Sequence, residues 1–162
     1  MPFKPDELTA EGELKVPYFA SQGKEIPGRG THKSQKQLQE EIRALMMRVG
    51  AGMVEFKAGH WEESDRYGFQ VEFSLNGHPG RLECAALPIR SVTEIRKDRA
   101  LAQALYWLRD WLQGEINSRL FRPGAVALLP FLVDENGRTV TELYIEKVGE
   151  EHLRGLYLPA PK

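Results

Sequence analysis

A long helical pattern beyond the middle of the chain constrains the fold most strongly. Apolar residues recur every three or four positions over 101–116, which gives a helix one continuous apolar face. Ser91 and Glu94 have the spacing of a capping box, and Pro123-Gly124 closes the segment. We therefore predict a helix that starts at about residue 93 or 95 and ends at 118. Its core stripe is Leu101, Leu105, Leu108, Leu112 and Ile116, and Trp107 and Trp111 widen the same apolar face.

A shorter helical pattern precedes it, and three alternating segments lie between the two. Residues 34–49 carry one apolar face, with Ser34 as a predicted N-cap and Gly50 as a C-terminal stop. Alternation of apolar and polar residues predicts strands, because successive strand residues point to opposite faces. These strands cover 54–58, 69–75 and 82–86. Asn76-Gly77 favours a tight hairpin turn between the second and third strands.

Together these elements predict an α+β fold in the order α-β-β-β-α. A three-stranded antiparallel sheet would carry the two main helices packed on one face. The other face would then hold polar residues: Glu55, Lys57, Gln70, Glu72, Ser74, Arg81 and Glu83. The predicted parts of the chain are an extended N-terminal arm (1–33), a core domain (34–118) and a C-terminal extension packed on the core (119–162).

Both flanking segments have weaker patterns than the core. The arm contains four prolines and four glycines, and a short strand over 16–19 could dock on the body. In the extension, residues 125–133 fit either a short helix or a strand, and 140–145 fit a further strand. We expect the extension to cover the open face of the sheet or to join its edge.

Composition excludes several classes of protein. The 22 basic and 23 acidic residues give a net charge of −1, which argues against coating of nucleic acid by the whole surface. Cys84 is the single cysteine and excludes a disulfide framework or multi-thiolate metal site. The longest apolar run, 125–133, is too short to span a bilayer, and residues 1–20 lack a secretion signal. We expect a cytoplasmic protein with no membrane partner, no metal and no cofactor.

Charge is unevenly distributed along the chain. Residues 22–48 hold six basic and three acidic residues, whereas 134–151 hold two basic and six acidic ones. Cations also open the second helix, where they oppose the helix dipole unless an anion binds there. This asymmetry permits a local anionic partner, although ordinary surface variation explains it equally well. Glu94 and Asp98 could also neutralise the cations of the helix start.

The order of elements over 34–118 resembles the double-stranded-RNA-binding domain. The hairpin over 69–86 is similar, and so is the basic opening of the last helix over 96–100. In that family the start of the last helix grips phosphates, while the first helix and the loop between the first two strands touch minor grooves. The loop here reads Gly59-His60-Trp61 in place of the family's Gly-Pro-x-His. The resemblance implies that the nucleic-acid-binding residues are Lys33, Lys36, His60, Trp61, Arg96, Lys97 and Arg99.

The sequence also resembles a group of small uncharacterised proteins from phages and prophages. The matching segments are Lys33-Ser34, the Ala104–Trp107 stretch of the second helix and the turn at 136–139. This resemblance implies a mobile-element context and no activity.

Three functions remain open at this point. The first is a non-catalytic accessory protein that binds nucleic-acid phosphates, DNA or RNA. The second is an accessory factor that binds a host protein through the acidic segment 142–151. The third is a metal-dependent nuclease that uses Glu55 and Lys57, although no aspartate lies on a neighbouring predicted strand to complete its metal site. We favour the first, and therefore expect no enzyme activity.

Overall fold

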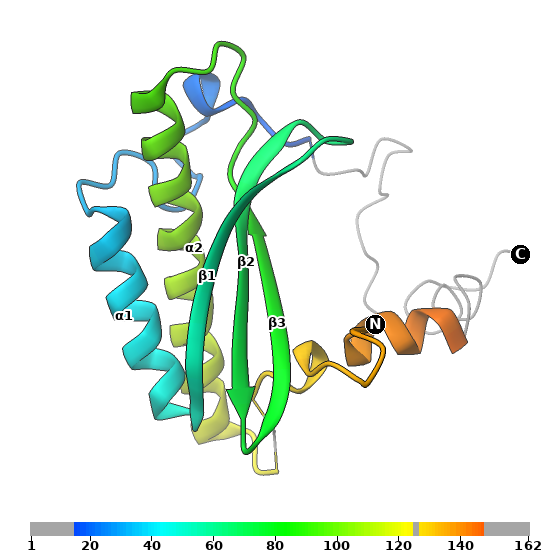
Figure 1. Ribbon diagram of the computed structural model, residues 1–162. Helices are drawn as coiled ribbons and strands as arrows, with labels where there is room; N and C mark the ends of the chain where they lie inside the picture. Colours follow the sequence, from blue (N-terminus) through cyan, green and yellow to red (C-terminus); the bar gives the residue numbers. More distant parts are fainter. Residues whose placement is uncertain (1–14, 125–126, 148–162) are drawn as a thin grey trace, which may run out of the picture.

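The computed structural model of the protein describes residues 15–124 and 127–147. Three antiparallel strands form one sheet in the order β1-β2-β3, and a long helix lies on each side of them in the chain (Figure 1). The α+β class and the α-β-β-β-α order are confirmed. The elements are η1 (Phe19–Ser21), α1 (Gln35–Arg48), β1 (Ala51–Trp61), β2 (Arg66–Leu75), β3 (His78–Ala85), α2 (Glu94–Phe121) and η2 (Leu129–Phe131), where η is a 3-10 helix. Residues 140–147 are helical as well.

Both long helices cover the same face of the sheet. They run side by side in one layer, and the strands form the second layer (Figure 1). The alternating apolar residues of β2 and β3 point into the space between the layers and meet the predicted stripes of both helices. Ile42, Val71 and Leu105 are completely buried there. This single core fixes the two helices relative to the strands and therefore positions everything at their ends.

The ends of α1 follow the sequence closely. Ser34 is the N-cap, and its side chain accepts a hydrogen bond from the backbone N–H of Gln37 at 3.1 Å. Gly50 follows the helix with a φ of +87°, a conformation that glycine adopts without strain. The helix begins one residue after the predicted start because Ser34 itself is the cap.

The start of α2 corrects one detail of the prediction. Thr93, and not Ser91, is the N-cap: its hydroxyl accepts a hydrogen bond from the N–H of Arg96 at 3.2 Å. The carbonyl of Ser91 instead accepts a hydrogen bond from the Arg96 guanidinium at 2.9 Å. At its other end the helix continues past the predicted stop to Phe121.

The sheet contains one irregularity and one predicted turn. β1 begins at Ala51, and a bulge between Gly52 and Glu55 places Met53 at a φ of +52°. Because a bulge breaks the alternation of side chains, the sequence pattern revealed only the part of the strand beyond it. Asn76 and Gly77 have φ values of +51° and +82°, as the predicted tight hairpin requires.

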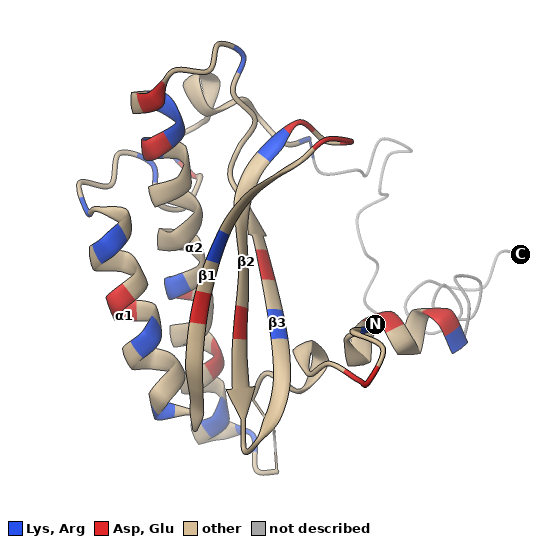
Figure 2. Cartoon of the chain, viewed as in Figure 1, with Lys and Arg blue, Asp and Glu red and all other residues tan. Residues whose placement is uncertain are grey.

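The open face of the sheet is polar, as predicted. Figure 2 shows basic and acidic residues alternating along β1 and β3. Lys57 pairs with Glu72 across β1 and β2, with 3.0 Å between Nζ and Oε2. Gln70 donates a hydrogen bond to Glu83 at 3.1 Å, and Arg81 lies 3.6 Å from the same carboxylate. Hydrogen bonds and ion pairs between polar side chains, within and across the strands, therefore occupy the face that the helices leave free.

The described part of the arm, residues 15–33, packs against α2 and the segment that precedes it. Phe19 donates its backbone N–H to the carbonyl of Pro88 at 2.9 Å. The buried amides of Gln22 and Gln103 bond to each other, and Gln103 also donates to the carbonyl of Pro27 at 3.0 Å. The predicted short strand at 16–19 is wrong, because a local turn closes Phe19–Ser21 into a 3-10 helix. Residues 1–14 of the predicted arm lie outside the described residues.

The C-terminal extension joins the sheet edge, one of the two placements expected. Leu132 forms an antiparallel bridge with Gly80, and the N–H of Val133 donates to the carbonyl of Pro79 at 2.9 Å. Of the segment 125–133, residues 125–126 are not described and Leu129–Phe131 forms η2. No helix among the described residues is long and apolar enough to cross a membrane.

The strand predicted over 140–145 is wrong, because this segment is helical. A reciprocal capping box starts the helix: the Thr139 hydroxyl accepts from the N–H of Glu142 at 3.2 Å, and the Glu142 carboxylate accepts from the N–H of Thr139 at 2.8 Å. Arg81 on β3 bonds to the same carboxylate at 3.0 Å. Thr139-x-x-Glu142 was therefore a helix signal that the apparent alternation concealed.

Candidate nucleic-acid interface

The starts of α1 and α2 are fastened to each other at one end of the molecule. The side-chain amide of Gln35, the first residue of α1, donates to the Asp98 carboxylate at 2.8 Å. One turn into α2, Arg99 donates to the carbonyl of Thr31 at 3.1 Å. The core orients both helices with their N-termini toward this end (Figure 1). The structure therefore brings together the two basic segments that the sequence separates by about sixty residues.

Three of the predicted cations at this end have no acidic partner in the part of the chain that the structure describes. Lys36, Arg96 and Lys97 form no ion pair with a described carboxylate, whereas Arg99 pairs with Asp98 at 3.2 Å. Arg96 is exposed, and Lys97 is partly buried. Arg96 and Lys97 belong to the first turn of α2, whose backbone N–H groups already carry partial positive charge, and Lys36 belongs to the first turn of α1.

Lys33 has a structural role that the sequence did not indicate. Its ammonium lies 2.6 Å from Oε1 of Glu41 on α1, and Arg109 of α2 lies 3.2 Å from the other oxygen of this carboxylate. The hydrogen bond from Lys33, together with Arg109, holds the pKa of Glu41 below its usual value. Lys33 therefore neutralises a carboxylate at the seam between the helices, and less of its charge is available to an outside anion.

His60 and Trp61 do not form the joint surface that the resemblance implies. Consecutive residues of β1 point to opposite faces of the sheet. His60 stacks on Tyr67, with 4.7 Å between the ring centroids, and Lys97 of α2 lies 4.7 Å from the centre of the same Tyr67 ring. Trp61 lies across Gly68, where a Cβ atom would approach its ring to 2.3 Å. His60 thus belongs to the end formed by the helix starts, and Trp61 belongs to the open face.

The turn that joins β1 and β2 is acidic. Glu62, Glu63 and Asp65 are exposed there, and Figure 2 shows this tip in red. The Asp65 carboxylate also lies within hydrogen-bond distance of Nε2 of His60, at 2.8 Å. Carboxylates at this position repel phosphates, so the hairpin tip does not provide the groove contact that the resemblance implies.

The residues of the nuclease hypothesis serve the open face. Lys57 donates to Glu72, and this hydrogen bond raises the pKa of the lysine. Glu55 lies opposite Glu72 in the register of β1 and β2. In the described ranges no group of three or more histidine, cysteine, aspartate or glutamate residues is placed to hold a metal ion. The geometry therefore gives Glu55 and Lys57 a cross-strand electrostatic role.

Cys84 is a buried core residue. Its side chain lies on the inner side of β3, and burial raises the pKa of the thiol to about 12. A thiol with such a pKa is almost entirely protonated at neutral pH, so it is a poor nucleophile and metal ligand.

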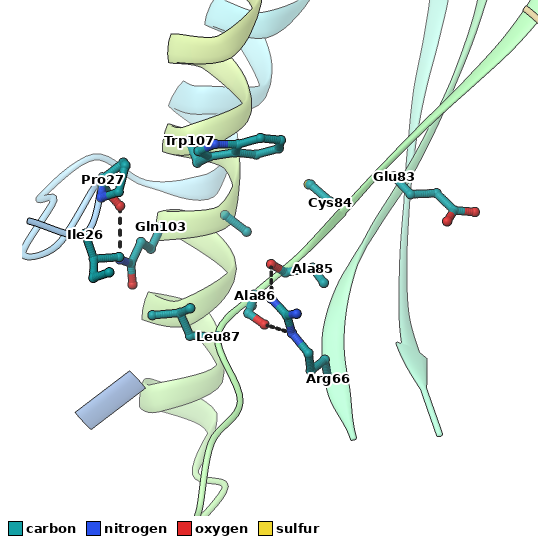
Figure 3. Close-up of a pocket in the computed structure, with 11 residues that line it drawn as sticks. Ile26, Pro27, Arg66, Glu83, Cys84, Ala85, Ala86, Leu87, Gln103 and Trp107 are labelled. Atoms are coloured by element: carbon teal, nitrogen blue, oxygen red, sulfur yellow. Dashed lines mark hydrogen bonds between the residues drawn. The ribbon is translucent and has the colours of Figure 1, made fainter. Parts of the chain in front are cut away.

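One concave feature was not predicted. A cavity of about 360 Å³ separates the end of β3 from α2, and Trp107 and Ile26 line its rim (Figure 3). We expected Trp107 and Trp111 to belong to the core, but 42% of the Trp107 surface is exposed. Trp107 and Trp111 lie four residues apart on α2, beside its leucine stripe. They make the apolar face of this helix wider than the three-stranded sheet can cover. That excess width was the available sequence signal.

Comparison with known proteins gives no match: no protein-family model, no curated protein and no solved structure is similar to this chain. The likeness to the double-stranded-RNA-binding domain therefore rests on the order of helices and strands.

Proposed function

We propose that this protein binds nucleic-acid backbone phosphates, without catalysis, through the adjoining starts of α1 and α2. The observation that carries the proposal is the junction itself. Gln35 and Arg99 hold the two helix starts together, and the first turn of each helix carries a cation that has no acidic partner among the described residues. The resemblance to phage and prophage proteins supports a mobile-element context for this role.

The chemistry of a helix start favours an anion. The first backbone N–H groups of α2 have no carbonyl acceptor within the helix. The Thr93 hydroxyl accepts a hydrogen bond from one of them, the N–H of Arg96. The positive end of the helix dipole and the side chains of Arg96 and Lys97 would act on the same phosphate. Lys36 of α1 supplies a further charge beside the junction. Lys97 is held over Tyr67 and is therefore partly ordered before any ligand binds.

The mode of binding would differ from that of the double-stranded-RNA-binding domain in one respect. The exposed carboxylates of the tip between β1 and β2 repel phosphate, and Trp61 packs on Gly68. Contact is then confined to one tract of backbone at the helix starts. Such binding depends on the charge of the phosphates and has little preference for base sequence.

A pair of matched double variants tests the proposal. Arg96→Gln with Lys97→Gln removes two charges at the proposed interface, and Arg119→Gln with Arg122→Gln removes two exposed charges near the opposite end of α2. Binding is measured by fluorescence anisotropy with labelled single- and double-stranded RNA and DNA over a series of salt concentrations. We expect the first variant to bind about tenfold or more weakly, with a salt slope reduced by about two, and the second to bind as wild type.

Two results would contradict the proposal. The first is the absence of wild-type binding to all four nucleic acids at low salt. The second is an equal loss in both double variants, because binding would then follow net charge and not the helix starts.

A further inference from the structure

Within the part of the chain that the structure describes, the outer edge of β3 is paired over only half of its length. At the turn end of the strand, Leu132 bridges Gly80 and Val133 donates to Pro79. In the rest of the strand, no backbone hydrogen bond from another described segment reaches Glu83. A strand edge with unpaired N–H and C=O groups is a template for another strand.

The hydrogen bonding of Ala86 shows which residues of β3 face outward. Its N–H donates to the carbonyl of Tyr67 on β2 at 2.7 Å. In an antiparallel ladder the direction of the backbone groups alternates, so Cys84 also faces β2, whereas Glu83 and Ala85 point to the outer edge. Pro79, whose carbonyl accepts from Val133, has the same outward parity and confirms this assignment. Arg66 donates to the carbonyl of Ala85, so the unpaired groups centre on Glu83.

A groove of apolar character runs beside these unpaired groups. Its floor is the edge of β3 over 83–87, and its opposite wall is α2. In Figure 3 the ring of Trp107 projects from α2 toward β3, and Ile26 and Pro27 also line the cavity. The cavity of about 360 Å³ has room for a large apolar side chain, and Arg66 and Glu83 are the charged residues in its lining.

The chain itself shows how such a groove is filled. Phe131 packs edge-to-face on Trp111, with 5.5 Å between the ring centroids, while the next residues pair with the edge of β3. Trp107 lies one helical turn before Trp111 and stacks on it at 6.4 Å. Trp107 therefore has the same position relative to the open half of the β3 edge that Trp111 has relative to the paired half. Residues 15–124 and 127–147 supply no backbone segment with an apolar side chain at the open half.

We infer that the open half of the β3 edge binds an extended peptide of a partner protein. The peptide pairs its backbone with Glu83 as a fourth strand, and one aromatic or large aliphatic side chain enters the groove beneath Trp107. Main-chain hydrogen bonds supply affinity in this mode and the side-chain pocket supplies selectivity. A second copy of the chain, paired about a two-fold axis at Glu83, would place two glutamates directly opposite each other, which disfavours self-pairing.

Two variants of one residue separate backbone pairing from charge. Glu83→Pro removes the outward N–H and leaves the hydrogen bonds to β2 intact, as Pro79 does in the same strand. Glu83→Ala removes the same carboxylate and keeps the N–H. Peptides are first selected from a random displayed library on the full-length wild-type protein, and binding of each selected synthetic peptide is then measured for wild type, both variants and Trp107→Ala.

We expect the selected peptides to share an apolar anchor and to slow hydrogen exchange at the amides of Glu83 and Ala85. Glu83→Ala should bind within about twofold of wild type, and Glu83→Pro and Trp107→Ala about tenfold or more weakly. Circular dichroism checks that each variant is folded. If a variant is unfolded, the sites at which peptide binding slows hydrogen exchange in the wild-type protein provide the test. Failure of the library to yield a binder, a footprint away from β3, or a wild-type dimer with these amides already protected would overturn the inference.

Discussion

The two faces of the sheet are built from the same strands but are held by different forces. On the inner face, Val71, Leu82 and Cys84 are buried against the helices. On the outer face, the neighbouring residues form pairs between charged side chains that remain partly exposed to water. Burial of an apolar side chain stabilises a fold by about 1.5–3 kcal/mol, whereas an exposed ion pair contributes about 0–1 kcal/mol.

This difference teaches where function can be added to the fold. The inner face determines the position of every element, so substitutions there disturb the whole structure. The outer face, the helix starts and the β3 edge bury less apolar surface, so we expect substitutions there to disturb the structure less. The predictions below test that division, from the largest expected effect on the free energy of unfolding to the smallest.

The inner face is tested most severely by Leu105→Ala. Leu105 is completely buried at the centre of α2, and its removal leaves a cavity that the neighbouring side chains fill only in part. We expect a loss of about 2–5 kcal/mol in the free energy of unfolding, measured by urea denaturation. A loss below about 1 kcal/mol would mean that the core is much looser than the contacts between α2 and the sheet indicate.

Gly80→Ala tests the close packing of the same face. A Cβ atom at Gly80 would lie 2.2 Å from the ring of Phe73, so the ring must move. Overpacking of this kind costs about 1–3 kcal/mol. The matched substitution Gly59→Ala, in a position with open space around it, should leave the thermal unfolding temperature almost unchanged. Equal effects of the two substitutions would argue against the position of Phe73.

The buried thiol of Cys84 makes a pH-dependent test. Because its pKa rises from the ordinary value of 9.0 to about 12 in the folded protein, the thiolate forms more readily in the unfolded chain. The stabilisation is complete below the ordinary pKa and is lost as the pH rises from about 9 toward 12. Wild type should lose about 1.4 kcal/mol more than Cys84→Ala per pH unit in this window. If the stabilities of wild type and Cys84→Ala, measured by urea denaturation, change in parallel with pH, the thiol is exposed to water in the folded protein and the prediction is wrong.

Thr139→Ala tests the attachment of the extension at the sheet edge. The variant removes one half of the capping box and should weaken the helix over 140–147, with a cost of about 0.5–2 kcal/mol. The backbone N–H of Thr139 holds the pKa of Glu142 below its ordinary value, so this contribution is present above that value and lost as the pH falls. Amide exchange of residues 142–147 measures both effects, and the core strands should keep their protection.

Lys57→Ala should produce the smallest change. The ammonium is exposed and its ion pair with Glu72 is screened by water and salt. We expect no resolvable change in the urea denaturation midpoint, with Lys57→Gln as the control for side-chain length. A clear destabilisation would show that the outer face is covered in solution.

Local patterns carried most of the fold. Period-two alternation placed Phe69 and Val71 on the inner face, and the Ser34 cap and Asn76-Gly77 turn have local chemical signatures. Errors arose where two local signals competed. At 140–145 an apparent alternation concealed the Thr139-x-x-Glu142 capping box, and at Met53 a bulge interrupted the strand.

The candidate site was less accessible to sequence reasoning. The basic segments were visible, but the ion pair of Lys33 with Glu41 depends on how α1 packs on α2. His60 and Trp61 are adjacent in the chain, and the strand separates them onto opposite faces. The exposure of Trp107 depends on the extent of β3 beside it. Such features arise from tertiary packing, which a single sequence does not encode in any short window.

The unbroken length of α2 has a consequence for both proposed ligands. The helix runs from Glu94 to Phe121, and a rise of about 1.5 Å per residue separates Arg96 from Trp107 by about 16 Å along its axis. The two proposed sites would therefore lie on one rigid helix, about three helical turns apart, and the helix would fix the distance between the two ligands.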